Sequence, residues 1–163
     1  MYVLVFISLA TRRIEYVACT SNPDGRWVAQ QARNLIMQLG DEQPFRYLIH
    51  DRDPKFTNGF DEIFRSEAIK VIRTPVQAPS ANAYAERWVR TLRADCLDRI
   101  LIFGRRHLEQ VLRIYRHHYN AHRPHRALQL QPPDCSNPTP LGATDRLCRR
   151  DLLGGLIHEY EAA

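Results

Sequence analysis

Residues 45–59, FRYLIHDRDPKFTNG, run out of an apolar stretch that has the pattern of a β-strand into a polar segment with two aspartates. Asp51 and Asp53 stand just where the strand is expected to end, and Pro54 follows at once. A carboxylate at such a place can form a turn, hold a metal ion or simply face water. Open α/β sheets gather their ligand-binding groups at the carboxyl ends of strands, so Asp51 is the first candidate site residue.

The surrounding sequence predicts an α/β fold. Asn22 and Pro23 are expected to begin a helix that Gly40 ends, and Phe45, Tyr47 and Ile49 share one face of the strand before Asp51. Strands that precede helices, after an initial hairpin, indicate a mixed sheet flanked by helices. The expected elements are strands over 2–9 and 14–20 joined by the turn ATRR, a helix over 22–40, a strand over 45–50, a short helix over 60–69 and a strand over 70–74.

The second half of the chain has the periodicity of helices. Two apolar stripes are expected to face the core: Ala85, Trp88, Val89, Leu92 and Cys96 on one helix, and Leu108, Val111, Leu112 and Tyr115 on the next. Prolines then mark a boundary. We predict one core domain over residues 1–131, a proline-rich linker over 132–144 and a C-terminal tail over 145–163.

Positive charge is concentrated in one segment. The whole chain has a net charge of +5, whereas residues 87–126 contain ten arginines against three acidic residues, a net charge of +7. Such a segment favours a polyanionic partner, because each neutralised phosphate releases counterions. A solvated helical face explains the same charge equally well.

The composition argues against several other classes of protein. The chain has no run of about 18 apolar residues, so a membrane span is not expected. Four cysteines stand far apart with no C-x-x-C pair, which favours reduced thiols in a cytoplasmic protein. Four histidines between residues 117 and 125 have no cysteine or carboxylate at ligand spacing, so a zinc site is disfavoured.

Glu86 is the second candidate site residue. It stands near the start of a predicted helix, beside the apolar stripe, where it could reach the end of a sheet. Together with Asp51 it could hold Mg²⁺, which prefers oxygen ligands, and paired ions about 3.5–4 Å apart serve phosphodiester chemistry. The competing interpretation is a surface ion pair with Arg90, four residues further along the helix.

Three motifs resemble those of retroviral integrases and the related insertion-sequence transposases. HDRDPKF at 50–56 is similar to their S-D-N-G-P-E-F segment, with Asp51 at the place of the catalytic aspartate. TPVQAPSANAYAERWVRTLRADCLD at 74–98 resembles the stretch that carries their catalytic glutamate, which falls on Glu86. HHYNAHRPHRAL at 117–128 is similar to their Y-N-x-x-R-P-H-x-x-L signature. The resemblance covers about residues 2–133.

The resemblance implies an RNase H-like fold and DNA strand transfer by a D, D, E triad with two Mg²⁺ or Mn²⁺ ions. Asp51 and Glu86 would be catalytic metal ligands, and Arg87, Arg90 and Arg93 would contact DNA phosphates. DNA, as element ends and target, and further copies of the chain are the partners implied. Structural roles are expected for two groups: Ser80, Asn82 and Tyr84 before the Glu86 helix, and Asn120, Arg123 and His125 after the second long helix.

The resemblance also predicts that one strand of the family's sheet is missing. Family members carry their first catalytic aspartate on a first, central strand, and no position of this sequence matches that aspartate. We therefore expect an N-terminally truncated core that is inactive alone. The strands over 2–9 and 45–50 would lose their shared partner. Instability is then expected, unless these two strands pair directly.

Two other functions remain open at this point. The chain could be a non-catalytic nucleic-acid-binding remnant that inhibits transposition, which the basic segment favours. It could also be an RNase H-like nuclease, which would need the same acids and release a nicked strand instead of a joined one.

Overall fold

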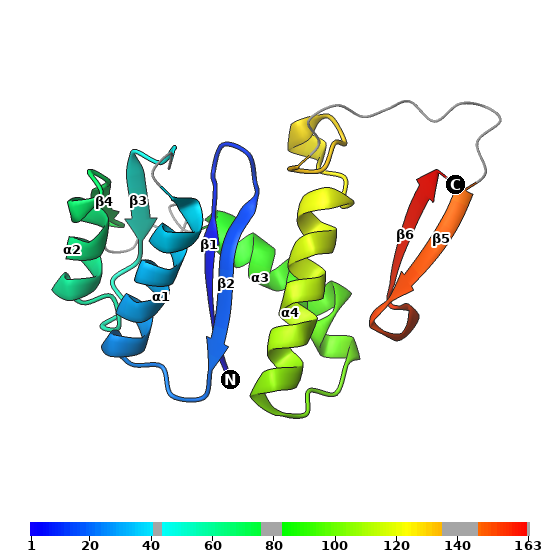
Figure 1. Cartoon of the computed structure of the whole chain (residues 1–163), viewed down its shortest axis with the longest axis horizontal. Helices are drawn as coiled ribbons and strands as arrows, with labels where there is room; N and C mark the ends of the chain where they lie inside the picture. Colours follow the sequence, from blue (N-terminus) through cyan, green and yellow to red (C-terminus); the bar gives the residue numbers. More distant parts are fainter. Residues whose placement is uncertain (41–43, 76–82, 135–146, 163) are drawn as a thin grey trace. The chain divides into compact units, whose positions relative to one another are not determined.

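The computed structural model describes residues 1–40, 44–75, 83–134 and 147–162. It confirms the mixed α/β class. The N-terminal half contains β1 (Tyr2–Ile7), β2 (Ile14–Thr20), α1 (Gly25–Leu39), β3 (Tyr47–His50), α2 (Asn58–Ser66) and β4 (Lys70–Arg73). The other elements are α3 (Ala83–Asp95), η2 (Leu97–Arg99), α4 (Gly104–Ala121), η3 (Arg126–Leu128), β5 (Leu147–Leu152), η4 (Leu153–Gly155) and β6 (Ile157–Ala162) (Figure 1).

The strands form two-stranded sheets within the described residues. β1 pairs with β2, β3 pairs in parallel with β4, and β5 pairs antiparallel with β6. β1 and β3 do not pair with each other, so each has one edge without a strand partner in the described part of the chain. β1 and β3, which do not pair here, correspond to the two strands that flank the central strand in the family that the chain resembles.

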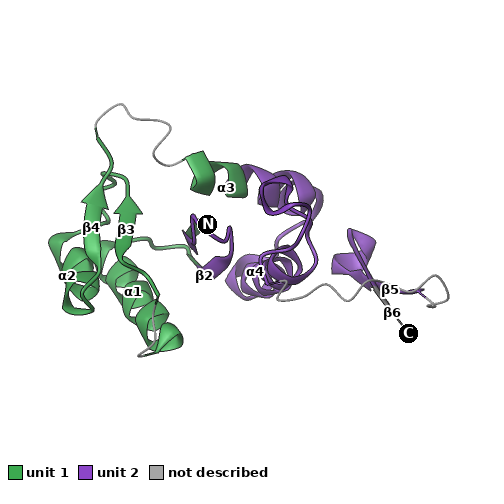
Figure 2. Cartoon of the chain, turned by 90° about the horizontal axis from the view of Figure 1, so that it is seen from above, with its two compact units in different colours: residues 1–5, 18–88 green, residues 6–17, 89–163 purple. Residues whose placement is uncertain are grey.

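The chain divides into two compact units, coloured green and purple in Figure 2. Unit 1 comprises residues 1–5 and 18–88, and unit 2 comprises residues 6–17 and 89–163. In unit 1, α1 lies beside α2, and α2 packs against β4. The face of the β3–β4 pair that carries Tyr47, Ile49 and Ile72 is exposed, whereas His50 points into the interior.

The core of unit 1 depends on two capped helices. Asp24 caps α1 by accepting a hydrogen bond from the Trp27 amide at 2.7 Å. The predicted start at Asn22 and Pro23 was therefore wrong: the aspartate carboxylate satisfies a first-turn amide that the amide side chain two residues earlier does not reach. Thr57 caps α2 in the same way through the Phe60 amide.

Unit 2 is built around α4. The predicted inward stripe is confirmed, since Leu108, Val111, Leu112 and Tyr115 are all buried. Of the other predicted stripe, Leu92 on α3 and Cys96 just after it are buried as expected, as is Trp88 on the part of α3 that belongs to unit 1, but Val89 is 40% exposed. Val89 lies at the border of the apolar stripe, where helical spacing alone does not decide which side of the border a residue takes.

The C-terminal tail forms a β-hairpin from β5 and β6. Ile157 and Glu159 of β6 are buried, and the Glu159 carboxylate contacts His118 Nδ1 at 3.1 Å and His122 Nε2 at 3.7 Å. The sequence predicted neither the hairpin nor this partner for the histidines. The predicted boundaries of the core, linker and tail stay predictions. Residues 135–144 of the linker and 145–146 of the tail lie outside the described residues.

The described helices include none that is long and apolar enough to cross a membrane. Cys19 and Cys96 are buried free thiols, and Cys148 is an exposed one. Burial, reinforced by the neighbouring Asp95, raises the pKa of the Cys96 thiol to about 11. Cys96 therefore serves as a packing residue of the α3 core rather than as a reactive group.

Candidate active site

Asp51 follows β3 directly and begins the turn that leads to α2. Its Oδ1 accepts a hydrogen bond from the Asp53 amide at 3.0 Å, which is the short side-chain-to-backbone contact that aspartate makes in turns. The side chain is half-buried. One carboxylate oxygen is thus used to shape the turn, and no hydrogen bond or ion pair to the other is found among the described residues.

Asp53 forms the next part of the same turn. Its Oδ1 accepts from the Lys55 amide at 2.9 Å, and both of its oxygens contact Lys55 Nζ. The hydrogen bond from the Lys55 side chain lowers the pKa of Asp53. Because Lys55 neutralises it and the turn uses it, Asp53 is a structural residue at this edge.

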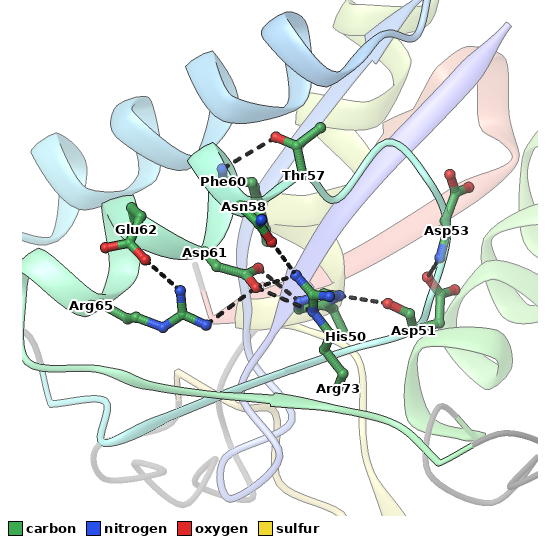
Figure 3. Close-up of polar contacts among 10 residues, drawn as sticks. All are labelled: His50, Asp51, Asp53, Thr57, Asn58, Phe60, Asp61, Glu62, Arg65 and Arg73. Carbon is green, nitrogen blue, oxygen red and sulfur yellow. Dashed lines mark hydrogen bonds and ion pairs between the residues drawn. The ribbon is translucent and has the colours of Figure 1, made fainter.

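β3, α2 and β4 each contribute a side chain to one polar cluster next to the Asp51 turn (Figure 3). His50 Nδ1 lies 2.6 Å from the Asp51 carbonyl oxygen, and His50 Nε2 lies 3.0 Å from Asp61 Oδ1 on α2. Arg73 of β4 donates to Asp61 Oδ2 through Nε at 3.2 Å and through Nη2 at 2.7 Å. No motif or spacing in the sequence predicted this cluster. The one available signal was Asp61 itself, an acid beside Phe60 and three residues before Phe64 on the apolar side of its helix.

Glu86 lies in the first turn of α3 and is exposed. It forms no ion pair with Arg90, although both residues are described, so the surface-pair interpretation is not realised. Asp51 and Glu86 belong to the same unit but share no hydrogen-bond or ion-pair partner among the described residues. Among the described residues, no three His, Cys, Asp or Glu side chains are grouped as a metal site.

The donor chemistry suits a single Mg²⁺ or Mn²⁺ better than two. Asp51 and Glu86 are both accessible carboxylates, and Mg²⁺ is commonly held by one or two carboxylates with water filling the remaining positions. A pair of ions needs further carboxylates. That Asp51 and Glu86 hold an ion stays a prediction; such an ion would polarise phosphate oxygens when bound.

The three predicted DNA contacts are exposed arginines of α3. Arg87, Arg90 and Arg93 are all exposed, and Arg93 Nε pairs with Asp98 at 3.3 Å. An exposed pair of this kind is weak, so it leaves the Arg93 guanidinium free to exchange partners. Tyr84 is exposed one turn before Arg87, and the other two predicted loop residues, Ser80 and Asn82, lie outside the described residues.

Asn120, Arg123 and His125 have the structural roles that were predicted for them. Asn120 Oδ1 accepts from the Ile14 amide at 2.9 Å, and its Nδ2 donates to the Ile14 carbonyl oxygen at 3.0 Å. Arg123 pairs with Asp95. The His125 ring packs on Tyr119 with ring centroids 4.7 Å apart.

The comparisons with known proteins concern one segment of the chain and its fold. The family model of the integrase core domain matches residues 67–133, which include Glu86 and the Y-N-x-x-R-P-H-x-x-L signature. No curated protein matches the chain in sequence. Asp51 lies outside the matched range.

The fold is shared with a chain of a retroviral intasome structure. A chain in the cryo-EM structure of the simian T-cell lymphotropic virus intasome in complex with PP2A regulatory subunit B56 gamma superposes with a TM-score of 0.62 at 12% sequence identity. The match covers 97% of this chain and 59% of that chain. At this identity the likeness concerns the fold alone, which confirms the RNase H-like architecture expected of an integrase core.

His125 gives unit 2 a dependence on pH. Burial lowers the pKa of its ring, as do the nearby Arg123 and Arg12, against an opposing hydrogen bond with the Tyr119 backbone. The unfolded chain, with an ordinary histidine value near 6.5, therefore binds the proton first as the pH falls. We expect the free energy of unfolding to decrease between about pH 7 and pH 5.5, by less than about 1 kcal/mol because the ring is partly solvated.

The measurement is urea unfolding at both pH values for the wild type and His125→Phe. The phenylalanine keeps the ring on Tyr119 and removes the titrating group, so it should reduce the pH dependence. The part that is due to His118, whose pKa burial also lowers, should remain. His117→Gln, at an exposed position of α4, is the control and should leave the dependence unchanged. An equal slope in wild type and His125→Phe contradicts the prediction.

Proposed function

We propose that the chain is the catalytic core of a DDE-type transposase or integrase, which joins DNA by metal-dependent phosphodiester strand transfer. The observation that carries the proposal is the integrase core match across Glu86, combined with an accessible carboxylate, Asp51, at the end of β3. In this proposal Asp51 and Glu86 bind Mg²⁺ or Mn²⁺ and are the catalytic residues. The DNA partners are element ends and target, held by an assembly of several copies in the cytoplasm.

Arg87, Arg90 and Arg93 would bind the DNA backbone in this assembly. Their exposure on the helix that carries Glu86 supports the proposal, because phosphates held there would lie along the helix that presents the acid. Arginine suits this role, since its planar guanidinium donates two parallel hydrogen bonds to one phosphate.

The catalytic step would require a third carboxylate. Two-metal strand transfer stabilises both the attacking and the leaving oxygen, and Asp51 and Glu86 supply ligands for one ion. We therefore expect the 163-residue chain alone to give no joined product. Joined product from the chain alone would mean that another of its acids completes the site.

The decisive test is strand transfer with Mn²⁺ by the protein as the cell makes it, on the DNA that flanks its gene. Glu86→Gln keeps the shape of the side chain and removes the charge, so joined product should fall by more than about 100-fold, given that an ion supplies several kcal/mol of charge stabilisation. Glu67→Gln changes an exposed acid in the same unit and should retain activity. Full activity of Glu86→Gln would overturn the proposal.

A non-catalytic DNA-binding protein that inhibits transposition is the second candidate. It is favoured by the exposed arginines of α3 together with the lack of a three-acid group among the described residues. DNA binding without any cleaved or joined product, in the full-length protein, would select it. An RNase H-like nuclease would instead release a nicked strand and no joined one.

A further inference from the structure

Asp61 is a fully buried carboxylate, with 0% of its surface exposed, on the side of α2 that faces the strands. A buried charge is costly unless it is paired and hydrogen-bonded. Asp61 meets this requirement through side chains of three elements: His50 of β3, Arg73 of β4 and, at 3.4 Å, Arg65 of its own helix. Arg73 Nη2 also donates to Asn58 Oδ1 at 3.0 Å, which ties β4 to the first turn of α2.

His50 connects this carboxylate to the candidate catalytic residue. Its buried ring contacts Asp61 Oδ1 through Nε2 and the Asp51 carbonyl oxygen through Nδ1. Phe56 and Phe60 pack on the ring with centroid distances of 4.8 and 5.5 Å. With both nitrogens engaged and its faces packed, the ring has one orientation.

The Asp51 backbone is thereby fixed from one side and its side chain from the other. His50 contacts the carbonyl oxygen of Asp51, and the Asp53 amide holds Oδ1. The end of the strand is also tied to β4, because the Thr74 amide donates to the His50 carbonyl oxygen at 2.9 Å and Arg52 Nε donates to the Thr74 carbonyl oxygen at 3.0 Å. Figure 3 shows the line of contacts from Asp61 through His50 to Asp51.

We propose that Asp61 and His50 are positioning residues that hold the Asp51 turn in the conformation that presents its free carboxylate oxygen to a metal ion. The role of these residues in metal binding rests on the proposed function, whereas their role in holding the turn does not. Groups behind a metal ligand commonly change metal affinity by about 10–100-fold when they are removed, which sets the size of the expected effect.

The test uses two variants and a matched control. Asp61→Asn removes the charge that anchors His50 and Arg73. His50→Phe keeps an aromatic ring between Phe56 and Phe60 and removes both hydrogen bonds. Glu62→Gln makes the same change of charge as Asp61→Asn at the next residue of α2, where the side chain is 68% exposed and pairs with Arg65.

The first readout is amide hydrogen exchange by NMR without metal. The Asp53 amide donates to Asp51, and its exchange rate should rise about tenfold in Asp61→Asn and in His50→Phe. In both variants the amides of α1 should keep their wild-type rates. In the control, Glu62→Gln, all amides should keep them. A merely structural role would raise exchange throughout unit 1. The proposal is overturned if exchange rates rise uniformly across unit 1, or if the exchange rate of the Asp53 amide is unchanged in a folded variant. If Asp61→Asn fails to fold, the result for His50→Phe decides.

The second readout is Mn²⁺ binding, followed by broadening of the amide signals around Asp51. Both variants should weaken Mn²⁺ binding about tenfold, and Glu62→Gln should not. If the wild-type protein binds no Mn²⁺ at Asp51, the proposed metal role fails, while the exchange measurement still decides whether Asp61 and His50 hold the turn.

Discussion

Tyr115→Ala is expected to destabilise the protein by about 3–5 kcal/mol, which is the usual cost of removing a fully buried aromatic side chain. Tyr115 is 0% exposed in the middle of the α4 stripe, and its ring packs on Tyr119 with centroids 6.2 Å apart. The hydroxyl donates to Asp95 Oδ2 at 3.0 Å. Since domains have only about 5–15 kcal/mol of stability, the alanine variant should be largely unfolded in mild denaturant.

Tyr115→Phe separates packing from hydrogen bonding. It keeps the ring and removes the hydroxyl, so Asp95 retains only its ion pair with Arg123. The expected cost is about 1–2 kcal/mol, the range for a hydrogen bond to a charged acceptor that is half-buried. Burial raises the pKa of Tyr115, so the hydroxyl remains a donor at any pH used for the measurement.

Urea unfolding followed by circular dichroism measures both values. Arg113→Ala, at an exposed position of α4, is the control and should change the free energy of unfolding by less than about 0.5 kcal/mol. Equal destabilisation by Tyr115→Ala and Arg113→Ala would mean that α4 does not pack on its predicted face.

Asn120→Leu has the second large expected effect. The Asn120 amide pairs with both backbone groups of Ile14, a residue with no exposed surface. Leucine has a similar size but no polar atoms, so it leaves a buried N–H and a buried C=O without partners. At about 1–3 kcal/mol for each orphaned group, the cost should be about 2–6 kcal/mol.

The same unfolding measurement, with His117→Ala as an exposed control on α4, tests this prediction. Hydrogen exchange of the Ile14 amide gives an independent check, because that amide should lose its protection in Asn120→Leu. An unchanged Ile14 exchange rate would show that the asparagine does not hold β2. The result would also separate a structural role of the Y-N-x-x-R-P-H signature from a catalytic one.

The sequence by itself determined the α/β class, the two apolar stripes of α3 and α4, and the place of Asp51 after a strand. These features are local. Periodicity of 3.6 residues decides which side of a helix is apolar, and the end of an apolar run followed by Asp and Pro decides where a strand stops. Departures such as the Asp24 cap and the exposed Val89 are shifts of one or two positions at the borders of elements.

Only the tertiary structure decided which residues support the Asp51 turn. His50, Asp61 and Arg73 come from β3, α2 and β4, and the contact of Glu159 with His118 joins residues that are 41 positions apart. No spacing rule links such residues, because each pair forms only when separate elements pack and the buried charge must find a partner. The separation of β1 from β3 is of the same kind, since strand pairing is a long-range choice between edges that look alike in sequence.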